Sequence, residues 1–127
     1  MQNEELKGKI LKVIKEYPVG SLATIKDGKP WVRYMMMQVH EGSSIYSTTF
    51  TASRKMAQIK ENNNVHIAFG ADPKSMMIPF VNVEGTAEIL TDPETKKKCW
   101  HDMLSEFFKG PDDPDYSVIK VTPRIME

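Results

Sequence analysis

The dipeptide Asp27-Gly28 is the feature that most restricts how this chain can fold. It stands between two strand-like runs, VGSLATIK at residues 19–26 and PWVRYMMMQVH at residues 30–40. Because Asp and Gly both tolerate positive φ, this dipeptide between two such runs predicts a tight β-hairpin. A second turn, HEGS, leads into SIYSTT at residues 44–49. The first part of the chain therefore predicts a meander of three antiparallel strands.

The rest of the chain alternates helices with short strands. Residues 4–16 have the periodicity of an amphipathic helix, and a second helix is expected at about 52–62. A third helix begins in TDPETKKK, where Asp92 can cap it and Pro93 can occupy its first position. Further strands are expected at 65–71, 78–90 and 117–122, with a loop at 72–74. Because the connections are too short for repeated crossover helices, we expect a mainly β fold, a closed or partly open β-barrel with helices packed outside.

Length and charge narrow the possible function classes. The 127 residues predict a single domain, 1–127, and a hydrophobic fraction of 40% suffices for one modest core. Lys and Arg (17) balance Asp and Glu (17), so no overall field draws the chain to nucleic acid or to an anionic membrane. No apolar run approaches the roughly 20 residues of a membrane helix. We therefore expect neither a nucleic-acid nor a membrane partner.

Cysteine and histidine positions carry two further expectations. Cys99 is the single cysteine, so no intramolecular disulfide can form and a cytoplasmic location is expected. His40, His66 and His101 have no metal-ligand spacing among them, so no metal site is expected.

The segment TFTASRKMAQIKEN has the composition of an anion site. It brings three hydroxyls and two cations, from Thr49, Thr51, Ser53, Arg54 and Lys55, to the start of a predicted helix. Helix N-termini bind anions through unpaired N–H groups, and cations in the first turn oppose the helix dipole unless an anion is bound. A simpler alternative is that Thr51 or Ser53 caps the helix and that both cations are solvated. The additional hydroxyls upstream favour a phosphate site.

A family resemblance rests on three segments: STTFTASRKMAQIKENNNVHIAF, VRYMMMQ and VNVEGTAEIL. They are similar to the phosphate-binding segment, the flavin-contacting strand and the next long strand of the pyridoxamine-5'-phosphate-oxidase-like FMN-binding split barrels. The resemblance covers about residues 5–123, and the short chain with its loop FFKGPDDPDY is similar to the general-stress-protein branch. It implies a six-stranded antiparallel split barrel with Greek-key character and outer α-helices.

The resemblance also implies an FMN site formed between two copies of the chain. Carried over by position, it places Arg33, Tyr34 and Met35 along the flavin, Thr48 and Thr49 beside it, and Ser53, Arg54 and Lys55 on its phosphate. Trp100 is expected in the core or at the dimer interface, and as a cofactor contact it would belong to the partner's pocket. Whether Arg33 contacts the ring or the phosphate stays open. A homodimer is implied, and an outward methionine, Met35 or Met37 depending on register, is expected near its interface.

The expected function is that of an FMN-binding flavoprotein that acts as an oxidoreductase on an unknown substrate, with nicotinamide or another small molecule as its partner. Gln38 stands where the pyridoxal-forming oxidases carry lysine, which argues against pyridoxine-phosphate oxidation. Two alternatives remain: a non-catalytic flavin-storage or sensing protein, and a split barrel that uses deazaflavin or haem. An oligonucleotide-binding barrel is disfavoured by the zero net charge and by only 9% aromatic residues.

Overall fold

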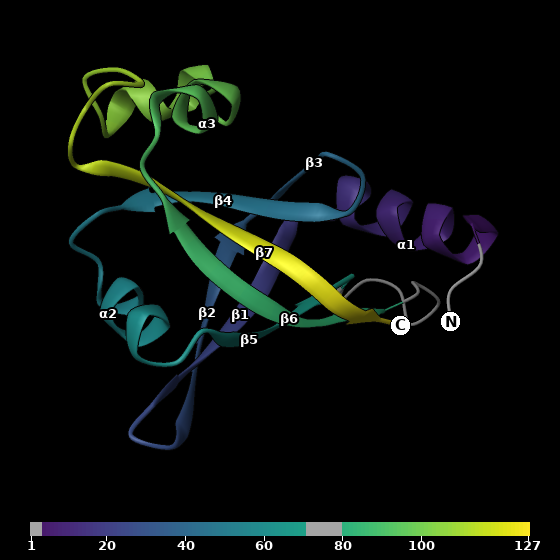
Figure 1. The fold of residues 1–127 in the computed structure, drawn as a ribbon. Helices are drawn as coiled ribbons and strands as arrows, with labels where there is room; N and C mark the ends of the chain where they lie inside the picture. The colour runs from purple at the N-terminus through teal and green to yellow at the C-terminus, as the bar shows by residue number, and fades with distance from the viewer. Residues whose placement is uncertain (1–3, 71–79) are drawn as a thin grey trace.

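The computed structural model describes residues 4–70 and 80–127, in which seven antiparallel strands form one curled sheet with helices around it (Figure 1). The helices are α1 (Glu4–Glu16), α2 (Arg54–Glu61), α3 (Pro93–Lys98) and the short 3-10 helix η1 (Asp102–Glu106). The strands are β1 (Val19–Lys26), β2 (Lys29–Met36), β3 (Gln38–His40), β4 (Ser44–Phe50), β5 (Asn64–Phe69), β6 (Val81–Leu90) and β7 (Tyr116–Met126). The mainly β, antiparallel split barrel is confirmed.

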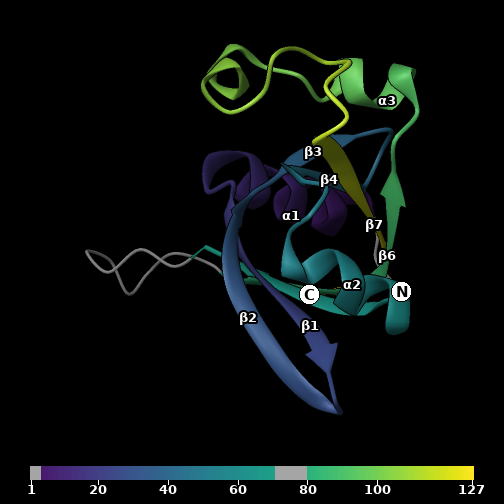
Figure 2. The ribbon, with the colours of Figure 1, turned by 90° about the vertical axis from the view of Figure 1, so that its left-hand side faces the viewer.

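The predicted hairpin is present at the start of this sheet. Asp27 and Gly28 have φ angles of 52° and 74°, and β1 pairs with β2 in register from Val19 opposite Met36 to Lys26 opposite Lys29. Both central residues therefore adopt the left-handed conformation that a two-residue hairpin requires. The tip of this hairpin projects beyond the other strands in Figure 1 and Figure 2.

The sheet is closed by its own connectivity. Its strand order is β2-β1-β5-β6-β7-β4-β3, so β2 and β3 form the two opposite edges. In the chain these two edge strands are separated by Met37 alone. The sheet must therefore curl until its edges meet. The Met37 N–H donates to the Pro18 carbonyl at 2.8 Å, and the Ser47 hydroxyl donates to the Met36 carbonyl at 2.9 Å, which ties this junction to both sides.

This junction also corrects the predicted strand count. The run at residues 30–40 was expected to form one strand, and the structure divides it at Met37 into β2 and β3. The physical reason is a change of partner: β2 pairs with β1, whereas β3 pairs with β4. The barrel therefore has seven strands in place of the expected six.

The core fills the interior of the barrel and is covered by two of the helices. Ile10 and Ile14 of α1 and Met56 and Ile59 of α2 join one buried cluster with Met37 and the inward residues of the strands. In Figure 1 the two helices lie on opposite sides of the barrel. The helices predicted at 4–16 and about 52–62 are thus confirmed, and α2 begins two residues later than expected.

Two further observations complete the fold. The predicted loop at 72–74 lies outside the described residues, as does the start of the strand predicted at 78–90. Within the part of the chain that is described, no helix has both the length and the hydropathy needed to cross a membrane.

Gly85 provides a test of how tightly the sheet is packed. It lies at a bulge between β6 and β7, where a Cβ atom would stand 2.3 Å from the Thr122 carbonyl oxygen. We expect Gly85→Ala to destabilise the fold by about 1–3 kcal/mol, because the two strands would have to separate. Gly8 in α1 has no atom near its Cβ position, so Gly8→Ala should stabilise by roughly 0.5–1 kcal/mol. Chemical denaturation measures both, and a Gly85→Ala protein as stable as wild type would contradict the packing described here.

Candidate functional site

The start of α2 lies beside the end of β4, and three of the predicted phosphate-binding side chains meet there. The Thr49 and Ser53 hydroxyl oxygens are 3.4 Å apart, and the Lys55 ammonium donates to the Ser53 hydroxyl at 3.1 Å. Ser53 occupies the N-cap position of α2 with extended backbone, yet its side chain makes no capping hydrogen bond. The Ser53 hydroxyl therefore does not accept from the N–H groups of the first helical turn. The hydroxyl and the unpaired N–H groups of that turn are both able to contact an anion.

Thr51 does not join this cluster. Its hydroxyl donates to the Pro114 carbonyl at 2.9 Å and lies 2.6 Å from the Ser117 hydroxyl, and its N–H donates to the Asp115 carbonyl at 2.8 Å. Thr51 therefore fastens the turn before α2 to the start of β7. Of the three hydroxyls expected to bind phosphate, only Thr49 and Ser53 are placed together.

Arg33 reaches the same region from β2. One of its terminal nitrogens, Nη1, donates to the Leu22 carbonyl at 3.1 Å, to the Thr24 hydroxyl at 2.8 Å and to the Trp31 carbonyl at 3.0 Å. The other, Nη2, donates to the Gln58 side-chain oxygen of α2 at 3.0 Å. The guanidinium is therefore held between the β1–β2 hairpin and α2 by neutral acceptors.

Within residues 4–70 and 80–127, no carboxylate forms an ion pair with Arg33, Arg54 or Lys55. The first turn of α2 contains no acidic residue, and Arg54 in that turn is exposed. Burial lowers the pKa of Lys55, and the positive charge of Arg33 lowers it further. Burial also lowers the pKa of Arg33. Both shifts show that the protonated forms are disfavoured in the absence of a ligand, so an anion bound between them would relieve the repulsion.

Three further predicted site residues, Tyr34, Met35 and Thr48, make no side-chain hydrogen bond to this cluster among the described residues. The Met35 side chain is buried in the core, so only its backbone remains for a ligand. Tyr34 alternates with Arg33 along β2 and is 80% exposed. Thr48 is half-buried and alternates with buried Thr49 along β4. Their roles as flavin contacts remain predictions.

The outward methionine is Met36. Met35 and Met37 were the two expected candidates, and both are buried, at 9% and 4% exposed, whereas Met36 is 51% exposed. The cause is the register of β2, which turns Met35 toward the core together with Arg33, and the strand break, which lets Met37 follow it inward. The expectation of an outward Met35 or Met37 was therefore wrong.

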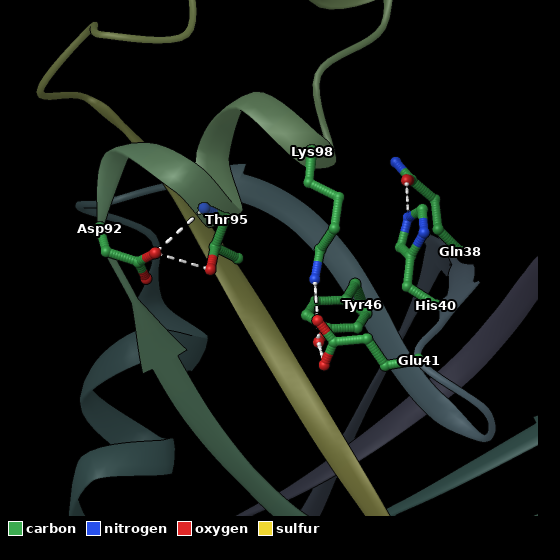
Figure 3. Close-up of polar contacts among 7 residues, drawn as sticks. All are labelled: Gln38, His40, Glu41, Tyr46, Asp92, Thr95 and Lys98. Atoms are coloured by element: carbon green, nitrogen blue, oxygen red, sulfur yellow. Dashed lines mark hydrogen bonds and ion pairs between the residues drawn. The ribbon is translucent and has the colours of Figure 1, made fainter.

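A lobe formed by α3, η1 and the following loop lies over β4 and β7, at the top of Figure 1. Figure 3 shows its anchor: the Lys98 ammonium forms an ion pair with the Glu41 carboxylate, which also accepts from the Tyr46 hydroxyl at 3.1 Å. At the other end of α3, the Asp92 carboxylate accepts from the N–H and the hydroxyl of Thr95, at 3.0 and 2.8 Å. The predicted Asp92 cap is confirmed, and the lobe is tied to the β3–β4 turn.

Trp100 belongs to this lobe. Its ring packs edge-on against Tyr116 with ring centroids 5.6 Å apart, in a second core cluster that includes Cys99. The Gln38 amide donates to the Cys99 carbonyl at 3.0 Å and lies 2.8 Å from His40 Nε2. Burial raises the pKa of Cys99 to about 11, so this thiol is not a reactive group. Trp100 is thus anchored in the lobe, which lies above β4 in Figure 1 and Figure 2, whereas α2 lies below it.

Two buried residues of the site were missed from the sequence. Thr24 on β1 and Gln58 on α2 both hold Arg33, and the Thr24 hydroxyl donates to the Gln58 oxygen at 2.5 Å. The available signal was a glutamine on the buried side of the helix, between Met56 and Ile59. Among the described residues, no group of three or more His, Cys, Asp or Glu side chains could hold a metal ion.

Comparisons with known proteins agree with the fold. The sequence profile of the family described as pyridoxamine 5'-phosphate oxidase matches residues 6–126. The chain is 38% identical over 123 residues to General stress protein 26 of Bacillus subtilis (strain 168), covering 97% of this chain and 87% of that protein.

Two solved structures extend the comparison. General Stress Protein 26 from Bacillus anthracis is 34% identical with a TM-score of 0.86, covering 96% of this chain and 92% of that one. A protein named F420 Reductase is 27% identical to this chain with a TM-score of 0.69, and the match covers 91% of this chain and 94% of that one. The family profile, the relatives and the curled antiparallel sheet lead to one conclusion: the chain belongs to the pyridoxamine 5'-phosphate oxidase family of split-barrel proteins.

Proposed function

We propose that this protein is an FMN-binding flavoprotein whose flavin phosphate is held at residues 49–55. The observation that carries the proposal is the positive charge at the start of α2, where Lys55 donates to a Ser53 hydroxyl that does not cap its own helix and where burial and the charge of Arg33 both lower the pKa of Lys55. Among the described residues, no carboxylate forms an ion pair with Arg33, Arg54 or Lys55. Surface cations of a protein usually have carboxylates or water around them. Here two half-buried cations, Arg33 and Lys55, lie close enough for the charge of Arg33 to lower the pKa of Lys55, after the larger effect of burial. A phosphate dianion satisfies both charges and the free helix N–H groups together.

Each side chain has a distinct task in this proposal. Lys55 supplies a compact charge and Ser53 and Thr49 supply hydroxyls, while exposed Arg54 closes the site from solvent. Arg33 approaches from β2 and donates from its free edge. The flavin ring extends from this phosphate toward Tyr34 and the backbone of Met35. Trp100 serves the site of the other chain, because it is anchored in the α3 lobe, on the other side of β4 from α2 in Figure 1 and Figure 2.

We further propose an oxidoreductase that acts on a small molecule, with reduced nicotinamide as one candidate. The bound flavin supplies the redox chemistry, and the protein supplies position and electrostatics. Gln38 is engaged with Cys99 and His40, so no lysine stands ready at the position where pyridoxal-forming oxidases carry one. This supports a substrate other than pyridoxine phosphate.

Two alternatives use the same pocket. A storage or sensing protein would bind flavin without turnover, and oxidation of reduced nicotinamide by the purified flavoprotein with an added acceptor separates it from an enzyme. A different cofactor, deazaflavin or haem, is the second alternative, and the similarity to the protein named F420 Reductase favours deazaflavin within it. The absorption spectrum of the purified protein distinguishes FMN, deazaflavin and haem.

A homodimer is part of this proposal. The edge strand β2 presents Val32, Tyr34 and Met36, at 63%, 80% and 51% exposed, and Val19 lies beside Met36 on β1. A continuous apolar stripe on an edge strand is a surface that proteins normally cover. A two-fold axis at this stripe would form two flavin sites. Each would be built on the phosphate cluster of one chain, which consists of Thr49, Ser53 and Lys55.

The first prediction concerns the phosphate. We expect FMN to bind more tightly than riboflavin, because the charge-assisted contacts go to the phosphate. Lys55→Ala should weaken FMN binding about tenfold or more, from the loss of roughly 1.5–3 kcal/mol for a hydrogen bond to a charged group. Fluorescence titration measures both constants. Equal dissociation constants for FMN and riboflavin in the wild-type protein would refute the proposed site.

The second prediction concerns the cost of this site in the absence of ligand. The folded-state pKa of Lys55 is depressed, so its protonated form opposes folding at every pH below the ordinary lysine value. We expect Lys55→Met to raise the melting temperature of the flavin-free protein at neutral pH while it weakens FMN binding. Lys60→Met, at the exposed end of the same helix, should not raise it. Calorimetry of flavin-free proteins decides, and a lower melting temperature for Lys55→Met would show that Lys55 is not strained.

The third prediction concerns assembly. Light scattering of dilute holoprotein should give twice the 14.5 kDa mass of one chain. Tyr34→Glu should shift the mass toward one chain and release FMN, because a charge would be buried in the interface. Lys12→Glu on the exposed side of α1 controls for added negative charge. A wild-type mass of one chain with FMN still bound would remove the dimer and the role assigned to Trp100.

A further inference from the structure

Thr24 and Gln58 form a buried polar pair beneath Arg33. Their side chains are 0% and 6% exposed, and the Thr24 hydroxyl donates to the Gln58 oxygen at 2.5 Å. The same two oxygens accept from Arg33, Thr24 from Nη1 at 2.8 Å and Gln58 from Nη2 at 3.0 Å. Two adjacent acceptors therefore take the terminal fork of the guanidinium, as a carboxylate would, but without its negative charge.

The hydrogen bonds leave one edge of the guanidinium unused. A guanidinium has five N–H donors in a plane. Nη1 has three acceptors, the Thr24 hydroxyl and the carbonyls of Leu22 and Trp31, for its two hydrogens. Nη2 has Gln58 alone, and Nε donates no hydrogen bond to a described residue. Because Nη1 and Nη2 are engaged end-on, the remaining N–H of Nη2 lies parallel to the Nε–H on the side edge of the plane.

The Arg33 guanidinium lies near the phosphate cluster of Thr49, Ser53 and Lys55. Gln58 and Lys55 are three positions apart on α2, so their side chains share one side of the helix. The positive charge of Arg33 is close enough to lower the pKa of Lys55. Two parallel N–H groups on one edge match two oxygens of a phosphate. The position of Arg33 thus depends on a glutamine that itself has no charge to attract the ligand.

We propose that Gln58 is a positioning residue that, together with Thr24, holds Arg33 with its Nε and Nη2 edge directed at the phosphate of the bound flavin. This rests on the proposed function, and it assigns Arg33 to the phosphate in preference to the ring. A neutral acceptor is required in this role, because a carboxylate at position 58 would cancel the charge that the phosphate needs. Gln58 acts on the ligand only through Arg33.

The experiment compares Gln58→Met with Met56→Leu. Gln58→Met keeps the volume of the side chain and removes the acceptor, while Met56→Leu changes a buried neighbour on the same helix that does not contact Arg33 through a hydrogen bond. We expect Gln58→Met to weaken FMN binding about tenfold, the worth of a hydrogen bond to a charged group, and to leave riboflavin binding unchanged. Met56→Leu should leave the ratio of the two dissociation constants unchanged.

A double-mutant cycle tests whether Gln58 acts through Arg33. Adding Gln58→Met to Arg33→Ala should cause no further loss of FMN affinity, because the arginine that it positions is gone. Independent losses that multiply in the double variant would overturn the proposal, as would an equal loss of FMN and riboflavin affinity in Gln58→Met, since both would mark Gln58 as a packing residue.

The role of Gln58 in holding Arg33 can also be measured in the flavin-free protein, which tests it independently of FMN binding. The chain has three arginines, Arg33, Arg54 and Arg124. In nitrogen-15 NMR of the flavin-free protein, Arg33 should show two separate Nη signals from a guanidinium that rotates slowly, and Gln58→Met should merge them, while the signals of exposed Arg54 stay unchanged. If the wild-type protein binds no FMN, the proposed function fails. A titration with inorganic phosphate then decides for the inference: affinity reduced about tenfold in Gln58→Met supports it, and unchanged affinity or unchanged Arg33 signals overturn it.

Discussion

The fold depends on a single covalent constraint: the two edge strands of the sheet, β2 and β3, are joined through Met37 alone. An open sheet of this strand order would place its edges six strand spacings apart, which one residue cannot span. The sheet therefore has to curl, and the curl creates the interior that the apolar side chains of the strands fill. The hydrogen bonds at Met36 and Met37, to Ser47 and Pro18, fix where the two edges come together. Curvature in this barrel is thus a consequence of connectivity before it is a consequence of packing.

The same curvature brings the cations of the site together. Arg33 lies on β2 and Lys55 on α2. Between them the chain passes from one edge strand of the sheet, β2, to the other, β3, and then through β4. Folding buries Lys55 and brings the charge of Arg33 near it, and both effects lower the pKa of Lys55. Neutral oxygens from Leu22, Thr24 and Gln58 satisfy the arginine while leaving its charge uncompensated. Binding sites for anions are commonly built in this way, because the fold supplies the repulsion that the ligand relieves.

The parts of the structure that could be predicted from sequence are those decided by local chemistry. The hairpin at Asp27-Gly28 follows from residues that accept positive φ, and the start of α3 follows from the Asp92 side chain. The strand break at Met37 has no local signal in the sequence, because Met35, Met36 and Met37 are equally apolar. The break arises from a change of pairing partner, from β1 to β4. The inward and outward methionines were misassigned for the same reason.

The candidate site shows the same division between local and long-range causes. The grouping of Thr49, Ser53 and Lys55 at the start of α2 was predictable, because these residues are neighbours in the sequence at a helix N-terminus. The orientation of the Thr51 side chain was not predictable, because its partners, Ser117 and the backbone of residues 114–115, are distant from it in the sequence. Gln58 was missed because a glutamine in a helix ordinarily faces water, and its buried partners, Thr24 and Arg33, are distant in sequence.

The two halves of the proposed flavin site differ in what they need from a second chain. The phosphate half is assembled from β2, the end of β4 and α2 of one chain, and its geometry is held by internal hydrogen bonds. The ring half has no such enclosure: Tyr34 is exposed, and Trp100 is fixed against Tyr116 in a lobe tied to the β3–β4 turn. A planar ring gains most from burial between apolar surfaces, and one exposed apolar surface of this chain lies on β2, next to the arginine that would hold the phosphate. A partner that covers this stripe would therefore enclose the ring and hide the edge strand in the same contact, so assembly and cofactor binding would stabilise each other.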